Sequence, residues 1–310
     1  MQVVFMGSPS FSLPTLRALA SDYDVSGVVT MPDRPAGRGG QLSPPPVKEL
    51  AMQLGLPLLQ PVRLKGEEVV SQLRAWKPDV VVVAAYGQIL PREVLNLPGL
   101  GCLNLHASLL PRYRGASPIA AAILAGDRVT GVTLVKMDAG MDSGPILAQE
   151  VAKILPEEDA GSLGDRLAEL ASAMVIRYLP RYLRGELVPA DQDPSRVSYA
   201  PRLHKEDGRL DFCDSALSLE RRIRALSPWP GAYCYWDRRR LKIIKAKLVA
   251  SQADSALTQP GKVFETSSGP AARTGAGDLL LLQVQLPGRK VLKGVDFARG
   301  ARGFLGSKLE

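Results

Sequence analysis

The sequence of 310 residues is 45% hydrophobic and 23% charged, and its formal net charge is +8. This composition excludes a disordered chain, and the length favours two domains over one. No apolar run reaches the roughly 18 to 20 residues that span a bilayer, and the first residues lack the basic start of a signal peptide. We expect a cytoplasmic protein with no membrane partner, acting as a monomer.

The cysteine and histidine content argues against metal and disulfide chemistry. Cys102, Cys213 and Cys234 are far apart and form no CxxC pair, and the whole chain has two histidines. The sequence therefore predicts neither a disulfide framework nor a bound metal. We expect all three thiols to be small buried groups.

The excess of positive charge lies in the last third of the chain. Residues 1 to 200 carry 19 basic and 20 acidic side chains, whereas residues 201 to 310 carry 20 and 11. A domain with that surplus is a candidate for binding a phosphate backbone, although a solvated basic surface explains the charge equally well. The candidate residues are Arg221, Arg222, Arg224, Arg238, Arg239, Arg240, Lys242, Lys245 and Lys247.

The first 150 residues alternate short apolar runs with helical stretches, which is the pattern of a parallel sheet with crossover helices. Strands are expected over residues 2–6, 25–29, 79–84, 102–106 and 131–136. Helices are expected near residues 12–21, 46–54, 66–76 and 117–125, with a longer one over about 162–184. The sequence thus predicts an α/β fold for a first domain of residues 1–184.

A polar stretch follows, and the pattern then changes. Residues 185–203 carry three prolines and show neither helical nor strand period, which is typical of a linker. Beyond it, a helix is expected near residues 215–226, and strands over residues 232–236, 241–248, 262–266 and 279–286. Short strands separated by turns favour a small barrel for residues 204–310, and we expect the five-stranded kind that binds oligonucleotides.

Common nucleotide-binding and hydrolase motifs do not occur in the sequence. The first strand is followed by GSPSF rather than GxGxxG, and there is no GxxxxGK[ST], GxSxG or HExxH. Nicotinamide and ATP mechanisms therefore lose their main support. The carboxyl ends of the strands are the place to look for a site, because open α/β sheets bind their ligands there.

Polar side chains gather after the fourth and fifth expected strands. Asn104 and His106 are two residues apart, so in a strand they share one face. A loop rich in Gly and Asp, residues 137–144, follows the next strand, where neighbouring strand ends would bring Asp142 to the imidazole. A single histidine is more often structural than catalytic, and Asp138 in the same loop is more often a turn cap.

An amide, an imidazole and a carboxylate in one crevice fit the attack of a neutral amine on a formyl carbon. Asn104 would donate an N–H to the oxyanion that forms. His106 would supply or remove protons, since an imidazole of unperturbed pKa about 6.5 exists in both forms near neutrality. Asp142 would hold the imidazole in one tautomer and favour its charged form.

Longer motifs around these residues carry a family resemblance. NLHASLLPRYRGASPI over residues 104–119 and GVTLVKMDAGMDSGPIL over residues 131–147 resemble the folate-dependent formyltransferases. Three further motifs are similar to the methionyl-tRNA formyltransferase branch of that family: MPDRPAGRGGQ (31–41), AAYGQILP (84–91) and SPWPGAY (227–233). The resemblance spans nearly the whole chain, and no catalytic position departs from it.

The resemblance implies a Rossmann-like N-terminal domain, an OB-like C-terminal barrel and 10-formyltetrahydrofolate as the formyl donor. It implies that Asn104, His106 and Asp142 are catalytic. The acceptor that it implies is the α-amino group of methionyl initiator tRNA, and the reaction would serve translation initiation. The folate contacts that it implies are Tyr86, Gly87, Gln88, Ile89 and Leu90, partly through the backbone, and Ser108, Leu109, Leu110 and Pro111.

The loop of residues 32–41 contains Arg34 and Arg38 among prolines and glycines, so it is cationic and does not form a helix. By itself it is an ordinary exposed loop, or a flexible segment that orders on a phosphate-bearing partner. The resemblance favours the second interpretation. The loop would then wedge into the acceptor end of the tRNA, with Arg38 as the main contact.

Two other classes of protein stay open. A formyltransferase or formyl-folate hydrolase acting on a small molecule would share Asn104, His106 and Asp142, but it would need neither the basic barrel nor the arginine loop. A plain RNA-binding protein would explain the charge but not the three converging side chains. We therefore favour the tRNA-directed transferase.

Overall fold

The structure is a computed structural model that describes residues 1–36, 41–249 and 259–310. These residues form two compact units. Unit 1 comprises residues 1–118, 128–153 and 163–201, and unit 2 comprises residues 119–127, 154–162 and 202–310. A single boundary within residues 185–203 would leave two short stretches of unit 2 with unit 1.

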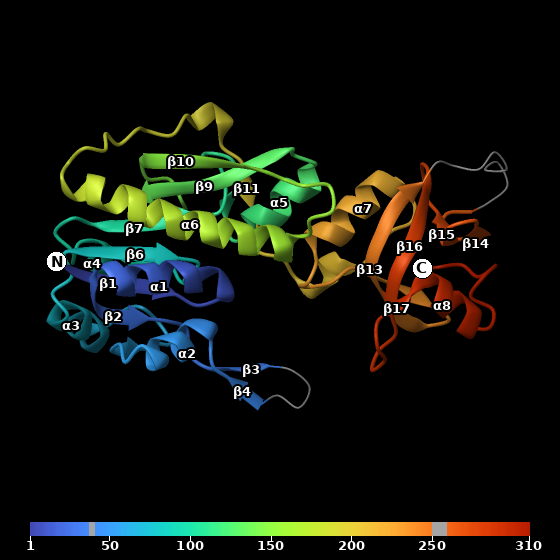
Figure 1. Ribbon diagram of the computed structural model, residues 1–310, viewed down its shortest axis with the longest axis horizontal. Helices are drawn as coiled ribbons and strands as arrows, with labels where there is room; N and C mark the ends of the chain where they lie inside the picture. Colours follow the sequence, from blue (N-terminus) through green and yellow to red (C-terminus); the bar gives the residue numbers. More distant parts are fainter. Residues whose placement is uncertain (37–40, 250–258) are drawn as a thin grey trace. The chain divides into compact units, whose positions relative to one another are not determined.

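Unit 1 is built on a seven-stranded sheet with the strand order β10-β9-β7-β6-β1-β2-β5 (Figure 1). The strands are β1 Gln2–Gly7, β2 Asp24–Val29, β5 Leu58–Leu59, β6 Val80–Ala84, β7 Cys102–His106, β9 Val129–Lys136 and β10 Ile146–Lys153. Strands β1, β2, β5, β6 and β7 are parallel to one another. The expected Rossmann-like sheet is confirmed, and every strand expected before residue 150 lies in it.

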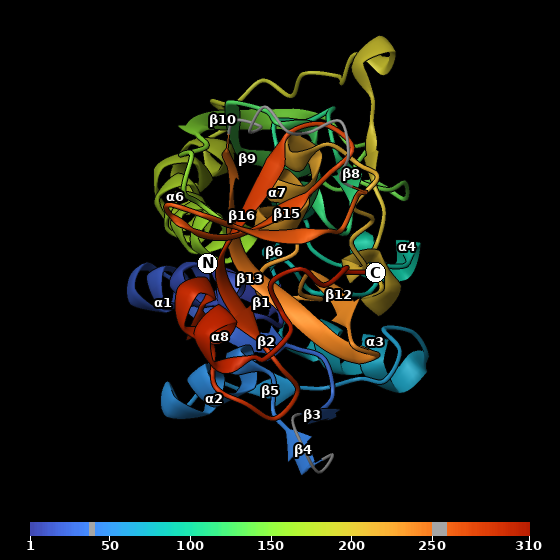
Figure 2. The same ribbon diagram turned by 90° about the vertical axis from the view of Figure 1, so that its right-hand side faces the viewer.

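Helices cover both faces of this sheet. Figure 2 shows α1, α2 and α6 on one face and α3 and α4 on the other. Their bounds are α1 Leu13–Asp22, α2 Pro46–Gln53, α3 Glu67–Ala75, α4 Arg92–Leu95 and α6 Ala160–Leu183, with a 3-10 turn η1 at Ser10–Ser12. Because both faces are covered, β6 is buried at every position and needs no polar alternation.

The direction of β9 differs from the expectation of a wholly parallel sheet. β9 pairs antiparallel with β7, so that Lys136 lies opposite Leu103 and the chain leaves β9 beside the start of β7. The helix between these strands, α5 (Pro118–Ala125), belongs to unit 2 from residue 119 onward. It therefore does not return the chain across this sheet as a crossover helix would. β10 then pairs antiparallel with β9 at the edge.

The loop of residues 32–41, which contains Arg34, is more regular at its two ends than expected. Strands β3 (Arg34–Ala36) and β4 (Gln41–Ser43) pair as an antiparallel ribbon. Arg34 is exposed, and Arg38 lies outside the described residues. At the root of the ribbon, hydrogen bonds from Lys48 and Gln60 hold the pKa of Asp33 below its usual value.

Unit 2 contains an OB-like barrel, made of a curled antiparallel sheet with the order β12-β13-β16-β15-β14 and with β17 paired to β16. The strands are β12 Tyr233–Trp236, β13 Arg239–Val249, β14 Val263–Thr266, β15 Gly269–Arg273, β16 Asp278–Gln285 and β17 Leu292–Lys293; the helical elements of the C-terminal part are η3 Lys205–Gly208, α7 Ala216–Ala225 and α8 Gly294–Gly300. The sequence does not predict β15, because its residues are Gly, Pro, Ala and Arg rather than β-branched or aromatic.

The barrel core of unit 2 is filled by aromatic side chains from different elements. Trp236 packs edge-to-face on Phe297 and Phe304, with ring centroids 5.5 and 5.4 Å apart, and the two phenylalanine rings are 4.8 Å apart. Such T-shaped pairs add to the stabilisation that burial alone gives.

Among the described helices of either unit, none is long and apolar enough to cross a membrane.

The three thiols differ in environment, and the expectation that all are buried is wrong for one. Cys102 and Cys234 are buried, and burial raises the pKa of each thiol to about 12. Cys213 is exposed, because it lies in a turn where its backbone N–H donates to Asp211. The Asp211 carboxylate raises the pKa of the Cys213 thiol.

We expect a disulfide reagent to modify one thiol per chain in the folded protein at pH 8 and three in denaturant. The reason is access, since thiol reactivity needs both exposure and the thiolate. The change in absorbance of the released aromatic thiol gives the count. The Cys213→Ser variant should give no reaction when folded, and two modified thiols in the folded wild type would contradict this assignment of burial.

Candidate active site

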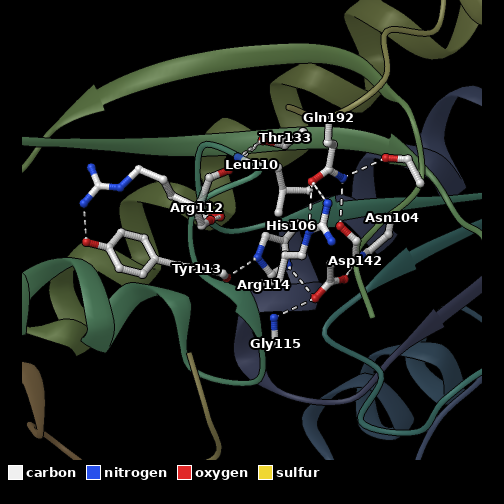
Figure 3. A network of polar contacts seen from close by, with 12 residues as sticks. Asn104, His106, Leu110, Arg112, Tyr113, Arg114, Gly115, Thr133, Asp142 and Gln192 are labelled. Carbon is white, nitrogen blue, oxygen red and sulfur yellow. Dashed lines mark hydrogen bonds and ion pairs between the residues drawn. The ribbon is translucent and has the colours of Figure 1, made fainter. Parts of the chain in front are cut away.

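The three polar residues expected to converge are in contact (Figure 3). Asn104 and His106 project from the same face of β7, and His106 is only 6% exposed. Asn104 Nδ2 donates to Asp142 Oδ1 at 3.3 Å, and His106 Nδ1 lies 3.6 Å from Asp142 Oδ2. The amide and the imidazole therefore share one carboxylate.

Asp142 reaches β7 by a route that the sequence does not predict. Its loop joins two antiparallel strands, β9 and β10, and begins at Met137, whose N–H donates to Cys102 at the start of β7. The loop then folds back along β7 as far as His106. Close packing makes this possible, because a Cβ on Gly144 would overlap the carbonyl oxygen of Lys136.

The second nitrogen of His106 has a partner that the sequence does not predict. His106 Nε2 lies 2.9 Å from the carbonyl oxygen of Tyr113, and the N–H of Gly115 donates to Asp142 Oδ2 at 2.9 Å. Both ring nitrogens thus face oxygen acceptors. Backbone groups carry these contacts, and side-chain motifs give no signal for them.

A turn in an unusual conformation presents these backbone groups. Tyr113 has φ +61° and Gly115 has φ +115°. A Cβ on Gly115 would lie 2.8 Å from the carbonyl oxygen of Ala200, so only glycine fits there. Gly115 and Ala200 lie opposite each other in a short parallel pair of strands, β8 (Arg114–Gly115) and β11 (Tyr199–Ala200).

Residues 190–201, expected to be linker, pack against this turn as part of unit 1. Besides β11 they contain a 3-10 turn, η2 (Pro194–Arg196). Ser198 Oγ accepts a hydrogen bond from the Tyr113 N–H, and Ala190 exchanges backbone hydrogen bonds with Ile146. The side chain of Gln192 contacts both Arg114 and the Asp142 loop. Polar residues and prolines without a period give no sign of such packing.

The loop after β6 holds the first group of expected folate contacts. Tyr86 and Leu90 are buried, whereas Ile89 is 81% exposed. Gln88 is engaged internally, because its amide accepts from the Leu64 N–H and donates to the Pro61 carbonyl. Gly87 has φ +97°. What this loop can offer a ligand is its backbone and the Ile89 side chain.

The second group of expected folate contacts, residues 108–111, is held from within. Ser108 Oγ donates to the Arg112 carbonyl, and Thr133 Oγ1 donates to the Ser108 carbonyl. The Leu110 N–H donates to Thr133, and Gln149 donates to the Leu110 carbonyl. Ser108 and Leu110 are buried. The contacts fix the shape of the chain directly after His106.

The basic residues of unit 2 fall into two groups. The arginines of α7 contact other residues of unit 2: Arg222 donates to the Asp207 carbonyl, and Arg224 pairs with Glu220. A Cβ on Gly126 would overlap the guanidinium of Arg221. The β12–β13 hairpin carries the second group, where Arg240 stacks on Tyr233 at 3.6 Å from the ring centroid.

A surface cavity of about 430 Å³ lies beside this hairpin and not at Asn104, His106 and Asp142. Four cationic side chains line it, together with two acidic residues, Asp237 and Glu310, and the aromatic side chains of Tyr235 and Trp236. The cations are Arg238, Arg239, Arg302 and Lys308. No group of three or more His, Cys, Asp and Glu that could hold a metal ion occurs among residues 1–36, 41–249 and 259–310.

Two models of known protein families match this chain. The formyl transferase model matches residues 1–179, and the model of the formyl transferase C-terminal domain matches residues 202–302. The chain therefore belongs to the formyl transferase family. Its curated relatives are more specific: methionyl-tRNA formyltransferases of Chloroflexus aggregans, 48% identical over 97% of each chain, and of Myxococcus xanthus, 45% identical over 99% of this chain and 97% of the relative.

Solved structures share the fold at lower identity. A sugar 3N-formyl transferase, WlaRD, has a TM-score of 0.68 at 16% identity and covers 94% of this chain and 99% of its own. A methionyl-tRNA formyltransferase from Clostridium thermocellum has a TM-score of 0.56 at 16% identity, covering 80% and 94%. HypX from Aquifex aeolicus, solved with tetrahydrofolic acid, has a TM-score of 0.65 at 18% identity; the match covers 98% of this chain but 48% of HypX.

Proposed function

We propose that this chain transfers the formyl group of 10-formyltetrahydrofolate to the α-amino group of methionyl initiator tRNA. The observation that carries the proposal is the contact of Asn104 and His106 with the single carboxylate of Asp142, at 3.3 and 3.6 Å. The full-length relatives named above are methionyl-tRNA formyltransferases, which favours this acceptor over a small molecule. We also propose that the protein acts in the cytoplasm as a monomer.

The roles we assign follow from the hydrogen bonds. One N–H of the Asn104 amide is used by Asp142, and the other can stabilise negative charge on the formyl oxygen. His106 Nε2 is held by the Tyr113 carbonyl, so Nδ1 is the nitrogen that takes a proton from the attacking amine. Asp142 lies beside Nδ1 and stabilises the imidazolium that results. As the bond between the formyl carbon and N10 of the folate breaks, Nδ1 returns that proton to N10, and tetrahydrofolate leaves.

The loop after β6 is chemically suited to a folate ring. A pterin presents a flat edge of donors and acceptors, and backbone groups can match both. Within the described residues, the N–H and C=O groups of Ile89 and Leu90 make no internal hydrogen bond. The exposed Ile89 side chain adds an apolar surface. The folate would supply an activated formyl group, and we propose that this loop and residues 108–111 position it beside Asn104.

We propose that the β12–β13 hairpin and the cavity beside it bind the RNA backbone, together with Arg34 and Arg38 of the loop in unit 1. Arginines stacked on tyrosines suit a nucleic acid, because they offer both charge and flat surfaces. The α7 arginines are less suited, since their contacts lie within unit 2.

Replacing Arg238, Arg240 and Lys242 by glutamine should weaken tRNA binding and flatten its salt dependence. Each lost phosphate contact lowers the slope of log K against log salt by roughly 0.7 to 0.9. Fluorescence anisotropy of labelled tRNA between low and moderate salt measures the slope. Lys245→Gln should change the slope less than the triple variant does, because Lys245 on the same strand already pairs with Glu157 at 3.1 Å. An unchanged slope in the triple variant would place the RNA elsewhere.

A label-transfer assay tests the function as a whole. The protein is incubated with formyl-labelled 10-formyltetrahydrofolate and charged initiator tRNA, and label should enter the aminoacyl ester. Parallel reactions contain an amino sugar nucleotide or no acceptor. Label in the sugar would identify a small-molecule transferase, and label in free formate without an acceptor would identify a hydrolase. Either result, without transfer to tRNA, would refute the proposal.

A further inference from the structure

Gln192 lies in the stretch expected to be a linker, yet its side-chain amide is used at both ends. Its Nε2 donates to the carbonyl oxygens of Asp142 and Gly144, at 2.8 and 2.7 Å. Its Oε1 accepts from Nε and Nη2 of Arg114, at 3.0 and 2.7 Å. One half-buried amide therefore joins the loop between β9 and β10 to strand β8 (Figure 3).

Both segments that Gln192 joins carry groups that face His106. Arg114 is flanked by Tyr113, whose carbonyl contacts His106 Nε2, and by Gly115, whose N–H donates to Asp142. Asp142 itself supplies the carboxylate beside Nδ1. The two sides of the imidazole are therefore held by segments whose separation depends on the Gln192 amide.

Both segments contain a residue in an unfavourable backbone conformation, which contacts from outside the segment must stabilise. Tyr113 and Asp142 are non-glycine residues with φ +61° and φ +48°, in the left-handed region. Such conformations persist where surrounding contacts fix them. The Gln192 contact to the Asp142 carbonyl acts directly on one of these two residues, and the contact to Arg114 acts on the neighbour of the other.

Glutamine suits this position by its chemistry. Two carbonyl oxygens require a donor and the guanidinium requires an acceptor, and a side-chain amide provides both. Glutamate offers only acceptors, and methionine has neither group at the same length.

We propose that Gln192 is a positioning residue for formyl transfer, which holds the Asp142 loop and the Tyr113–Gly115 turn at the separation that keeps His106 aligned. It touches neither substrate and acts through Asp142 and Tyr113. The inference rests on the proposed function, and it predicts a loss in kcat rather than in substrate binding.

The test compares Gln192→Met and Gln192→Glu with Asp191→Ala. Asp191 is an exposed neighbour whose side chain makes no hydrogen bond or ion pair with the described residues. We expect kcat to fall on the order of 10²-fold in both Gln192 variants, because a shift of about 1 Å in a catalytic group costs that much. KM for folate and for tRNA should stay within about twofold of wild type, and the thermal midpoint of unfolding should barely change. Asp191→Ala should behave as wild type.

A second readout does not depend on activity. The chain has two histidines, so the ring nitrogen-15 resonances of His106 can be assigned by comparison with a His204→Gln variant. In Gln192→Met we expect these resonances to shift and broaden, because the ring loses its fixed partners. In Asp191→Ala they should not move.

Three results would overturn the inference. One is a kcat within about twofold of wild type for Gln192→Met, with unchanged His106 resonances. Another is a raised KM with normal kcat, which would make Gln192 a binding residue. The third is a Gln192→Glu variant as active as wild type, since that change abolishes the donor. A wild-type protein that transfers no label to tRNA would instead refute the proposed function, and the His106 resonances would still decide whether Gln192 fixes the ring.

Discussion

Replacing His106 by alanine should lower kcat for formyl transfer by about 10²- to 10⁴-fold, the usual contribution of a general acid–base group. In the proposed mechanism the ring carries the nitrogen that takes the proton of the attacking amine, and no other imidazole lies in the described part of unit 1. Single-turnover transfer of labelled formyl to charged tRNA measures the loss. Because His106 is buried, His106→Gln serves as a second variant that keeps most of the side-chain volume.

Asp142→Asn should cause a loss of similar size. Asparagine tolerates the φ of +48° at this position, so the backbone is not strained by the change. The introduced asparagine keeps one oxygen that can accept from the Gly115 N–H. Its NH₂ group then faces the NH₂ donor of Asn104, and the negative charge beside His106 is lost.

Asp138→Asn is the matched control for Asp142→Asn, because both residues lie in the same loop. The Asp138 carboxylate accepts from the Gly140 N–H and the Ser143 hydroxyl, as expected for a turn cap. Transfer should remain near wild type in this variant. Near-normal turnover of Asp142→Asn or of His106→Ala would refute the catalytic assignment, and equal losses in Asp138→Asn would indicate a disordered loop instead.

Asp278→Ala should destabilise unit 2 by about 3–5 kcal/mol, the usual result of leaving one charge of a buried pair alone. Arg273 Nη1 lies 2.8 Å from both Asp278 oxygens, and the side chains are 8% and 1% exposed. The guanidinium also stacks over Phe264, so it has little freedom to reach solvent. Urea unfolding followed by tryptophan fluorescence measures the change.

Two controls separate the buried charge from loss of volume. The double variant Arg273→Met with Asp278→Leu removes both charges and should be much less destabilised than Asp278→Ala. Asp296→Ala breaks an exposed pair, 3.9 Å from Arg299, and should cost less than about 1 kcal/mol. An Asp278→Ala variant as stable as Asp296→Ala would show that the pair contributes little.

Local pattern was sufficient for most of the fold. The apolar run in β6 and the paired Asn104 and His106 in β7 mark strands, because burial and the two-residue period act within a few neighbouring positions. The sequence does not predict β15, since its small residues are selected by the space between β14 and β16 rather than by propensity.

The antiparallel direction of β9 is also not predicted by local pattern. It depends on where the preceding helix packs, and α5 packs in unit 2. Asp142 is brought to His106 all the same, but by a loop that folds back along β7 and not by the neighbouring carboxyl end of a parallel strand.

The amino-acid sequence was sufficient to identify the amide, the imidazole and the carboxylate, the basic C-terminal part and the family that their motifs resemble. The groups that hold these three side chains in place became evident from the folded chain alone. The Tyr113 carbonyl, the Gly115 N–H and the Gln192 amide act through backbone geometry and through contacts between residues up to 78 positions apart. Side-chain identity alone carries no information on such contacts, because any residue offers a backbone carbonyl and the fold selects the one that faces the imidazole.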